Sequence, residues 1–492
     1  MGPRRGVPFV FLAEIPAALP VRFAAPVRFV RVPVRSVALL VVPACATVDS
    51  VALGVGCAAV LRGRSGGLVA CVTMGKNNLS GLLCIFGNSR TFVGKRDDGM
   101  ETFFQTHAYL IEQTNAPVRR ALMDSIDWNY RMIGIKGPRG VGKTTFLLQY
   151  AKENFEPGMR QCLYVNMNSF YFQGRGLVDF ADEFYRCGGH VLLVDQAFKL
   201  PEWRRQLCEC YHKFPRLRIV YTTSSVENVN ELDDELSSIS RCYVLHGFSF
   251  REFINLQTGN AFRTYSLDEV LHEHEYILKS ILPKVRPWQY FHDYLHHGYY
   301  PFFLENRNFT EMLLKAMNMM IEVDILFIKQ IELKYLSRIK KLLYLLASDG
   351  AASPNVSSLA AAIGTSRATV MNYLKNLEEA RLINMIYREG DAFPKKPAVV
   401  MLHDTNLMYA VYSPSLSEQH IMECFFVNSL WRHHNIHRGR RDGIYRVDSA
   451  KDICVCDKNR RMKVDNSLYY AKYNAEVGHD NEIPLWLFGF LF

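Results

Sequence analysis

The chain has 492 residues, of which 49% are hydrophobic and 22% charged, a composition typical of a globular protein with about two to four domains. Its formal net charge is +10, but residues 1–99 contain 12 Lys or Arg and only 4 Asp or Glu, and so carry +8 of it. Residues 100–492 are therefore nearly neutral, and bulk charge gives no argument that they bind nucleic acid.

The first 99 residues differ from the rest in composition. Residues 1–73 lack Lys, Asn, Gln, His, Tyr and Trp, and are dominated by Ala, Val, Pro, Gly and Arg. Arg-rich, acid-poor sequence resembles a transit peptide. The apolar run over residues 38–61 resembles a membrane anchor, but Pro43 and Asp49 near its centre argue against a span. We favour an unstructured or over-long extension with Met100 as the true first residue, and we assign no fold to residues 1–99.

The 12 cysteines are scattered and form no C-x-x-C pair. The one-residue spacings "CEC" at 208–210 and "CVC" at 454–456 lack the further ligands that zinc requires. We therefore predict reduced structural cysteines, and with them a cytoplasmic protein that does not enter a membrane.

A glycine-rich stretch, "GPRGVGKT", follows a short apolar run from Met132 to Ile135 that predicts a buried strand. It matches the nucleotide-binding pattern G-x-x-x-x-G-K-[ST], and a helical apolar spacing follows it. In such a loop backbone amides bind phosphate oxygens, Lys143 neutralises the outer phosphates and the Thr144 hydroxyl binds Mg²⁺. The residues predicted to bind ATP are Gly137, Pro138, Arg139, Gly140, Val141, Gly142, Lys143, Thr144 and Thr145.

Strands and helices alternate after this loop, which implies a parallel sheet covered on both faces. Strands are predicted at 161–167, 190–195 and 217–225, and helices at 177–189 and 202–214. Ligands of such sheets bind at the carboxyl ends of the strands, where Asp195 and Thr222–Ser224 fall. We predict that Asp195 binds Mg²⁺ with Thr144, and that Thr222 or Ser224 contacts the outer phosphate or positions water. The alternatives are a turn-forming aspartate and a merely polar loop.

Residues 250–330 show a mostly helical pattern rich in Tyr, Phe and His, which we interpret as a helical lid over the nucleotide. The histidines of this segment could instead suggest zinc: His272, His274, His292, His296 and His297. His292 and His296 lie one helical turn apart, but no third ligand accompanies them. We therefore favour the lid without a metal.

Residues 337–390 predict a winged helix-turn-helix, since two short capped helices are followed by a strand and a turn. In DNA-binding proteins of this kind the early side chains of the second helix reach base edges. Those side chains would be Thr365, Ser366, Arg367, Thr369 and Asn372. Glu378 and Glu379 on the same helix favour the alternative, a module that packs between domains.

Six stretches in chain order resemble one known family: "GPRGVGKTT", "LLVDQAFKLPEWRRQL", "IVYTTSS", "HGFSFREF", "YLHHGYYPFFLE" and "IPLWLFGFLF". It is the family of bacterial AAA-type ATPases, abundant in Bacteroidetes, in which an ATPase domain precedes a winged helix and a nuclease-like domain of unknown function. The resemblance implies an α/β P-loop NTPase with an ASCE-type parallel sheet at 100–249, a helical lid at 250–335, a winged helix at 336–395 and a small α+β nuclease-like domain at 396–492.

The resemblance also implies ATP and Mg²⁺ as ligands, with hydrolysis assisted by a glutamate after the Walker B aspartate. This chain has Gln196 at that position. Glutamine can hydrogen-bond a water but cannot accept its proton, and general-base assistance contributes roughly 10²–10⁴-fold to rates. We therefore expect an ATPase that binds ATP and hydrolyses it slowly. Arg241 falls where the resemblance places a charge-stabilising arginine, and a surface arginine is the alternative.

Residues 421–461 resemble a nuclease motif in which acids hold Mg²⁺ and a lysine steadies the attacking water. By this resemblance the candidates are Glu423, Asp448 and Lys458, but Cys454 stands where the second-strand acid is expected. We expect the fold to be retained and cleavage to be lost. The run "HRGRR" at 437–441 could still contact phosphates.

Two other functions stay open at this point. One is a DNA-binding regulator that uses ATP as a structural ligand, which salt-dependent DNA affinity would reveal. The other is an interaction module of a defence or toxin–antitoxin system that binds a protein partner according to nucleotide state. The sequence does not indicate the oligomeric state.

Overall fold

The structure is a computed structural model, which describes residues 98–492 except 157, 228–234, 306, 412–416 and 460–466, together with six strands before residue 98. The chain divides into two compact units, Met1–Arg96 and Asp97–Phe492.

The first unit contains an antiparallel sheet with the order β2-β3-β1-β4-β5-β6. Its strands are β1 (Phe9–Ala13), β2 (Arg28–Arg31), β3 (Ala38–Val41), β4 (Cys57–Arg62), β5 (Leu68–Gly75) and β6 (Asn78–Leu83). The composition led us to expect an unstructured or over-long extension here, whereas the described parts are strands. Pro43 and Asp49, which bear on the membrane-anchor interpretation, lie outside the described residues.

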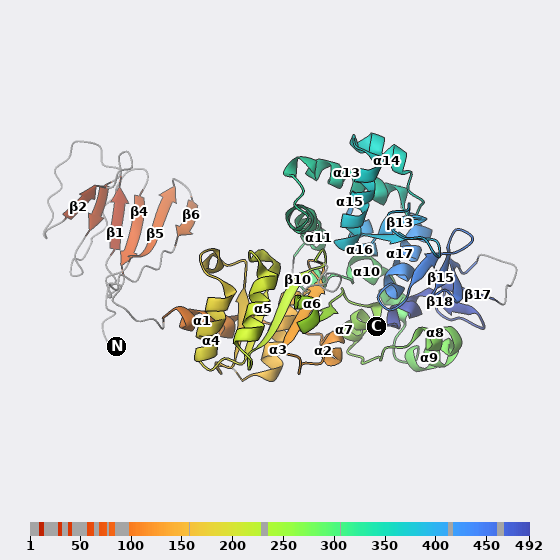
Figure 1. The fold of residues 1–492 in the computed structure, drawn as a ribbon, viewed down its shortest axis with the longest axis horizontal. Helices are drawn as coiled ribbons and strands as arrows, with labels where there is room; N and C mark the ends of the chain where they lie inside the picture. The colour runs from red at the N-terminus through yellow and green to blue at the C-terminus, as the bar shows by residue number, and fades with distance from the viewer. Residues whose placement is uncertain are drawn as a thin grey trace. The chain divides into compact units, whose positions relative to one another are not determined.

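The second unit contains a five-stranded parallel sheet with the order β11-β7-β10-β9-β8. Its strand β10 is labelled in Figure 1. Its strands are β7 (Met132–Gly137), β8 (Cys162–Asn166), β9 (Val191–Asp195), β10 (Arg218–Ser224) and β11 (Arg241–Val244). Continuous apolar runs such as "VLLVD" are typical of strands buried on both faces, and every residue of β9 is buried. The predicted α/β fold with a parallel sheet is confirmed.

Helices cover both faces of this sheet. On one face Phe146 and Leu147 of α3 share a core with Ile133 and Ile135 of β7. On the other face α4 and α5 pack with Leu192 of β9, while α1 contacts the edge strand β8. These helices and short turns are α1 (Asp98–Gln113), α2 (Leu122–Ser125), α3 (Lys143–Asn154), η1 (Phe170–Gln173), α4 (Leu177–Arg186), η2 (Ala197–Lys199), α5 (Trp203–Lys213) and α6 (Glu235–Ile239).

The segment that follows is helical. Ser249 caps α7 and Glu252 bonds back to the Ser249 backbone, so that both ends of a capping box are present. Its elements are α7 (Phe250–Thr258), α8 (Leu267–His272), α9 (His274–Ile281), α10 (Pro287–His297), η3 (Pro301–Leu304), α11 (Phe309–Met319), the π-helical turn η4 (Met320–Ile325), α12 (Leu326–Ile328) and η5 (Leu333–Tyr335).

Three helices and a two-stranded antiparallel sheet come next, α13 (Leu336–Asp349), α14 (Val356–Ile363), α15 (Arg367–Glu379), β12 (Ile383–Ile386) and β13 (Val399–Leu402). Gly364 ends α14 in the left-handed conformation that favours glycine. The Ser366 side chain accepts a hydrogen bond from the Thr369 amide and so caps α15. The two capped helices and the strand expected from the sequence correspond to α14, α15 and β12, and the winged helix itself stays a prediction.

The last part of the chain is a second five-stranded sheet covered by a buried helix. Strands β14 to β16 are antiparallel, whereas β16, β17 and β18 are parallel. The elements are α16 (Thr405–Val411), α17 (Glu418–Leu430), β14 (Ile436–Arg438), β15 (Ile444–Val447), β16 (Lys451–Asp457), β17 (Leu468–Tyr473), β18 (Glu482–Pro484) and η6 (Leu485–Phe490). Within the described part of the chain, no helix combines the length and the apolar character that crossing a bilayer requires.

Candidate functional site

The glycine-rich loop and the start of α3 form the floor of a cavity of about 400 Å³, within the size range of ligand pockets. Gly140 and Gly142 have φ angles of 84° and 93°, which favour glycine because it has no Cβ. The predicted residues Arg139 to Thr145 line the cavity, whereas Gly137 and Pro138 do not. Because α3 begins at Lys143, its amino end faces this cavity and favours an anion there.

Asp195, at the carboxyl end of β9, is 1% exposed and accepts hydrogen bonds from three hydroxyl groups. The donors are Thr144 at 2.8 Å, Thr222 at 2.5 Å and Tyr164 at 2.8 Å. Burial raises the pKa of the Tyr164 phenol, and Asp195 raises it further, so Tyr164 stays a donor. The sequence reading missed Tyr164, although its place near the carboxyl end of the neighbouring strand β8 was a usable signal.

Gln196 follows Asp195 with a left-handed backbone, φ 57° and ψ 45°, and lines the cavity. The backbone N–H of Gln196 donates to the Thr222 hydroxyl at 2.8 Å. Thr222 therefore connects the backbone of Gln196 to the Asp195 carboxylate. Ser224 also lines the cavity. Glu202, the next glutamate in the chain after Asp195, does not line the cavity. It precedes α5 without a side-chain capping bond, and its carboxylate pairs with Arg205 of that helix.

The Lys143 ammonium points back into its own loop. It donates to the carbonyl oxygens of Gly137 at 2.6 Å and Pro138 at 2.8 Å. Burial lowers the pKa of Lys143 to about 8, against the raising effects of Asp324 and Asp195; Arg139 lowers it further. In this state the loop cation is held by backbone carbonyls.

A segment more than 160 residues further along the chain covers the glycine loop. A Cβ at Gly140 would lie 2.6 Å from the Phe302 ring, and one at Gly142 would lie 3.7 Å from Pro301. Asp324 of η4 lines the cavity and forms an ion pair with Arg139 of the loop at 2.8 Å. The sequence reading missed Asp324, because no local pattern connects it to the loop.

Arg120 supports the opposite side of the cavity. It donates to the carbonyl oxygens of Val141 at 3.2 Å, His246 at 2.7 Å and Gly247 at 2.9 Å, and its Nε lies 3.2 Å from the carboxylate of Glu252. The neighbouring segment 115–118 and Phe248 complete the wall. This wall is more apolar than the loop, so it fits a base better than a phosphate.

Arg241 lies away from this cavity. It begins β11 and pairs in register with Ile133 of β7, toward the amino end of that strand, whereas the glycine loop follows the carboxyl end. Its guanidinium donates to the Tyr130 hydroxyl at 2.5 Å and lies 4.3 Å from the centre of that ring. Arg241 is therefore an exposed arginine near the amino ends of the strands, and its charge-stabilising role stays a prediction.

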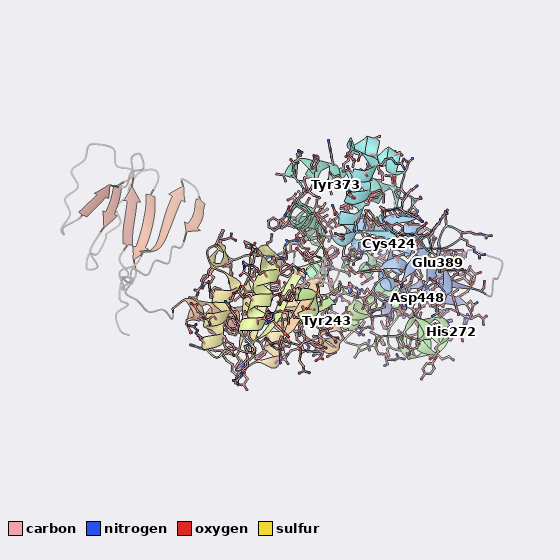
Figure 2. The ribbon with its side chains drawn as sticks, in the orientation of Figure 1. Tyr243, His272, Tyr373, Glu389, Cys424 and Asp448 are labelled. Carbon is pink, nitrogen blue, oxygen red and sulfur yellow. The ribbon has the colours of Figure 1, made fainter. Side chains whose placement is uncertain are left out.

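The nuclease candidates do not meet. Glu423, next to the Cys424 labelled on α17 in Figure 2, accepts hydrogen bonds from Tyr445 and Gln419. Asp448 accepts from His434 at 2.7 Å and from the Asn435 amide at 2.9 Å.

The strand pairing explains this separation. Val447 pairs with Lys451, so Asp448 lies where β16 begins, whereas Lys458 follows the end of β16. Among the described residues no group of three His, Cys, Asp or Glu side chains could hold a metal. The described histidines of residues 272–297 therefore belong to no such group either.

The two acids of α15 point into the protein. Glu378 accepts a hydrogen bond from the Met385 amide at 2.9 Å, and Glu379 pairs with Lys329 at 2.7 Å. Because these contacts account for both carboxylates, Glu378 and Glu379 do not argue against DNA binding by α15. Arg367 and Asn372 of the same helix are exposed.

Comparison with known proteins agrees with the cavity geometry. Residues 129–254 match the family model described as an AAA domain, and residues 289–408 match a domain of unknown function, DUF8612. The part of the chain that carries the glycine loop is thus similar to AAA domains.

The uncharacterized protein MJ1637 of Methanocaldococcus jannaschii is 26% identical over 275 residues, which cover 53% of this chain and 57% of that protein. The chain therefore spans little more than half the length of this curated relative. A solved variant of RuvB from Thermotoga maritima is 16% identical over 61% of this chain and 92% of its own, with a TM-score of 0.24. PCH-2 of C. elegans is 16% identical over 57% and 68%, with a TM-score of 0.23.

Proposed function

We propose that this protein binds ATP with Mg²⁺ in the cavity above the glycine loop and hydrolyses it slowly. The observation that carries the proposal is the 2.8 Å contact between the Thr144 hydroxyl and the Asp195 carboxylate at the start of α3. A helix amino end, a loop lysine and two hard oxygen donors then converge on one cavity, which is the arrangement that a nucleotide phosphate with its magnesium requires.

The residues around Asp195 fit a magnesium ion. Thr144 supplies a hydroxyl and Asp195 a carboxylate, the oxygen ligands that Mg²⁺ prefers. When bound, the ion would offset charge on the outer phosphates. Tyr164 and Thr222 would keep their bonds to the carboxylate and hold its orientation, as outer-shell partners do. Lys143 would exchange the carbonyls of Gly137 and Pro138 for phosphate oxygens.

Slow hydrolysis follows from the carboxylates that are available. Those lining the described cavity are Asp195, Glu305 and Asp324. Asp195 is engaged by three hydroxyls and Asp324 by Arg139, so Glu305 on the exposed rim is the remaining candidate to accept a proton from water. Gln196, next to Asp195, can orient a water but cannot deprotonate it. Arg139 is better placed than Arg241 to offset charge on the phosphates.

Nucleotide titration of the full chain tests the binding proposal. We expect ATP to bind with Mg²⁺, and Lys143→Ala to weaken binding by at least roughly 100-fold because it removes the cation next to the phosphates. Lys152→Ala is the matched control, because Lys152 lies at the far end of α3 and bonds the carbonyl of Thr114. Equal affinities for the unaltered protein and Lys143→Ala would contradict the proposal.

A second candidate function is binding of DNA through residues 336–395, which we propose to be a winged helix. Its support is the order of three helices and a two-stranded sheet, together with an arginine-lined cleft beside it. The Arg438 amide donates to the Tyr387 carbonyl at 2.8 Å, which brings Arg388 and Arg440 into one cleft. Both side chains are exposed, and no ion pair to another described residue engages them. Glu389, labelled in Figure 2, instead pairs with Arg446.

DNA binding by this cleft would depend strongly on salt. We expect Arg388→Ala with Arg440→Ala to lower duplex affinity and to reduce the salt slope by about two ions. Arg216→Ala, an exposed arginine of the ATPase domain, is the control. An unchanged salt slope in the double variant would reject this cleft as the DNA site.

The remaining functional predictions from the sequence stay predictions. They are a nuclease-like fold without cleavage for residues 396–492, a partner protein in a defence or toxin–antitoxin system, a cytoplasmic location and a bacterial origin. The covering of a five-stranded sheet by the buried helix α17 supports the first of them.

A further inference from the structure

A buried carboxylate lies in the proposed nucleotide cavity without a role in binding magnesium. Asp324 is 2% exposed and belongs to the π-helical turn η4, far along the chain from the loop that it contacts. Its two oxygens lie 3.0 and 3.1 Å from Nε of Arg139, and one of them lies 2.8 Å from Nη2. Two-pronged pairs of this kind are the stronger charge-assisted hydrogen bonds.

The charges around the cavity floor balance each other. Arg139 and Lys143 contribute two cations, and Asp324 and Asp195 contribute two anions. Asp195 is the proposed magnesium ligand, so Asp324 is the anion that offsets the loop cations when no phosphate is present. A terminal phosphate would bring additional negative charge to the same cations, and this charge would repel the Asp324 carboxylate more strongly in a buried site than in water.

Resting on the proposed function, we propose that Asp324 is a specificity-determining residue that makes the site distinguish nucleoside triphosphates from diphosphates. In the nucleotide-free and diphosphate states the Asp324 carboxylate holds Arg139. The terminal phosphate of a triphosphate competes for Arg139 and releases Asp324. The release costs part of the binding energy of ATP, whereas ADP binds with the pair intact.

The contacts of the segment around Asp324 show which parts of the protein its release would affect. Phe327 of α12, 60% exposed, lies 5.4 Å from the Lys199 ammonium, which follows the Walker B strand. On either side of it two ion pairs lead onward to the helices of residues 336–379. Glu322 pairs with Lys340 of α13, and Lys329 pairs with Glu379 of α15, both at 2.7 Å.

The segment 320–329 therefore contacts the glycine loop, the Walker B turn and both long helices of the following module. A π-helical turn is a frequent feature of functional sites. Movement of Asp324 would change the position of this segment, and with it the anchoring of α13 and α15.

The first test is the ratio of ATP to ADP affinity in Asp324→Asn, measured with Mg²⁺ on the full chain. Asparagine keeps the shape and one acceptor for Arg139 but removes the negative charge. We expect ATP affinity to rise by roughly tenfold or more while ADP affinity changes little. Glu322→Gln is the matched control, because it removes a carboxylate from the same turn that faces Lys340 instead, and it should leave the ratio unchanged.

The second test follows hydrogen exchange of the amides of residues 320–328. In the unaltered protein exchange should be faster with ATP than with ADP, and in Asp324→Asn it should be fast without nucleotide. Should Asp324→Asn fail to fold, Arg139→Lys keeps the loop charge and loses the two-pronged geometry, and it should raise the same affinity ratio.

The outcomes separate the two proposals. If the unaltered protein binds neither nucleotide, the proposed function is wrong and this inference falls with it. If the protein binds both nucleotides but the ATP to ADP ratio is the same in the unaltered protein, Asp324→Asn and Glu322→Gln, only the role of Asp324 is overturned.

Discussion

The two regions in which the sequence resembles a magnesium-binding motif differ in how their strands run. In the sheet that carries the glycine loop all strands are parallel, so the loop after β7 and the carboxyl ends of β9 and β10 lie on the same side of the sheet. Thr144, Asp195 and Thr222 meet there. In the C-terminal sheet β15 and β16 are antiparallel, so Asp448 and Lys458 fall at opposite ends of β16. Acids near strand ends form a site only when those ends coincide.

The largest effect that separates the two regions should come from paired substitutions. Asp195→Asn should abolish the Mg²⁺ dependence of ATP binding, with a loss of roughly 100-fold in affinity, because it removes the charge that holds the ion. Asp448→Asn should leave ATP affinity unchanged. Titration of ATP with and without Mg²⁺ checks both. An equal loss in the two variants would contradict the assignment of the metal to Asp195.

Asp404 gives the next largest effect, since it is a buried acid with which no cation of the described residues forms an ion pair. It accepts hydrogen bonds from the Tyr300 hydroxyl at 3.1 Å and from the Leu407 amide at 3.0 Å, and burial raises its pKa to about 7. Between its ordinary pKa and 7 the folded state binds a proton that the unfolded state does not. The folded protein therefore loses stability as pH rises through this range, by roughly 2 to 4 kcal/mol at pH 8.

Denaturant unfolding from pH 5 to pH 8 checks this expectation. Asp404→Asn has no charge to bury, so its free energy of unfolding should gain on that of the unaltered protein as pH rises. Asp442→Asn, at an exposed position, should show no such trend. A constant difference between Asp404→Asn and the unaltered protein would mean that Asp404 does not titrate in this range.

A smaller effect is expected from removing the Tyr164 hydroxyl, which donates a hydrogen bond to the Asp195 carboxylate. An aspartate at an ordinary strand end has no such buried donor. Tyr164→Phe removes one of three donors to a buried acceptor and should cost about 1 to 2 kcal/mol of unfolding free energy. It should also weaken Mg²⁺-dependent ATP binding severalfold. Tyr185→Phe on α4 is the control. Identical metal dependence in the two variants would show that Tyr164 does not position Asp195.

The smallest effects are expected where the structure separates predicted partners. Arg241→Ala should change the ATP turnover of a single chain by less than about twofold, because its guanidinium contacts Tyr130 on the side of the sheet where the strands begin.

Cys454→Glu restores the missing acid of the nuclease motif, but it should yield no Mg²⁺-dependent DNA cleavage. A gain of cleavage would show that Asp448 and Lys458 can meet.

The phosphate-binding half of the site could be predicted from sequence because its signals are local. The glycine loop, Lys143 and Thr144 are contiguous, and Asp195 ends an apolar strand. The position of Arg241 at the amino end of its strand could not be inferred from the sequence. Only the resemblance had placed the segment "RCYV" near the phosphates.

The lid contacts could not be predicted because they join distant parts of the chain. Arg139 and Asp324 are 185 residues apart, and nothing in "IEVDI" distinguishes Asp324 from a solvated helical acid. Glu379 was misleading about DNA binding for the same reason, since its partner Lys329 follows α12, far from α15 in the sequence. From composition we assigned no fold to residues 1–99, and the structure describes six strands there.

Single-turnover hydrolysis of Mg²⁺-bound ATP by the unaltered protein and by Gln196→Glu tests the central claim most directly. Both proteins should bind ATP with similar affinity, and the unaltered protein should hydrolyse it slowly. Turnover should rise by roughly 10²-fold or more in Gln196→Glu, because glutamate can accept the proton of the attacking water. Fast hydrolysis in the unaltered protein, unchanged by Gln196→Glu, would show that another group activates the water and that Gln196 does not limit this ATPase.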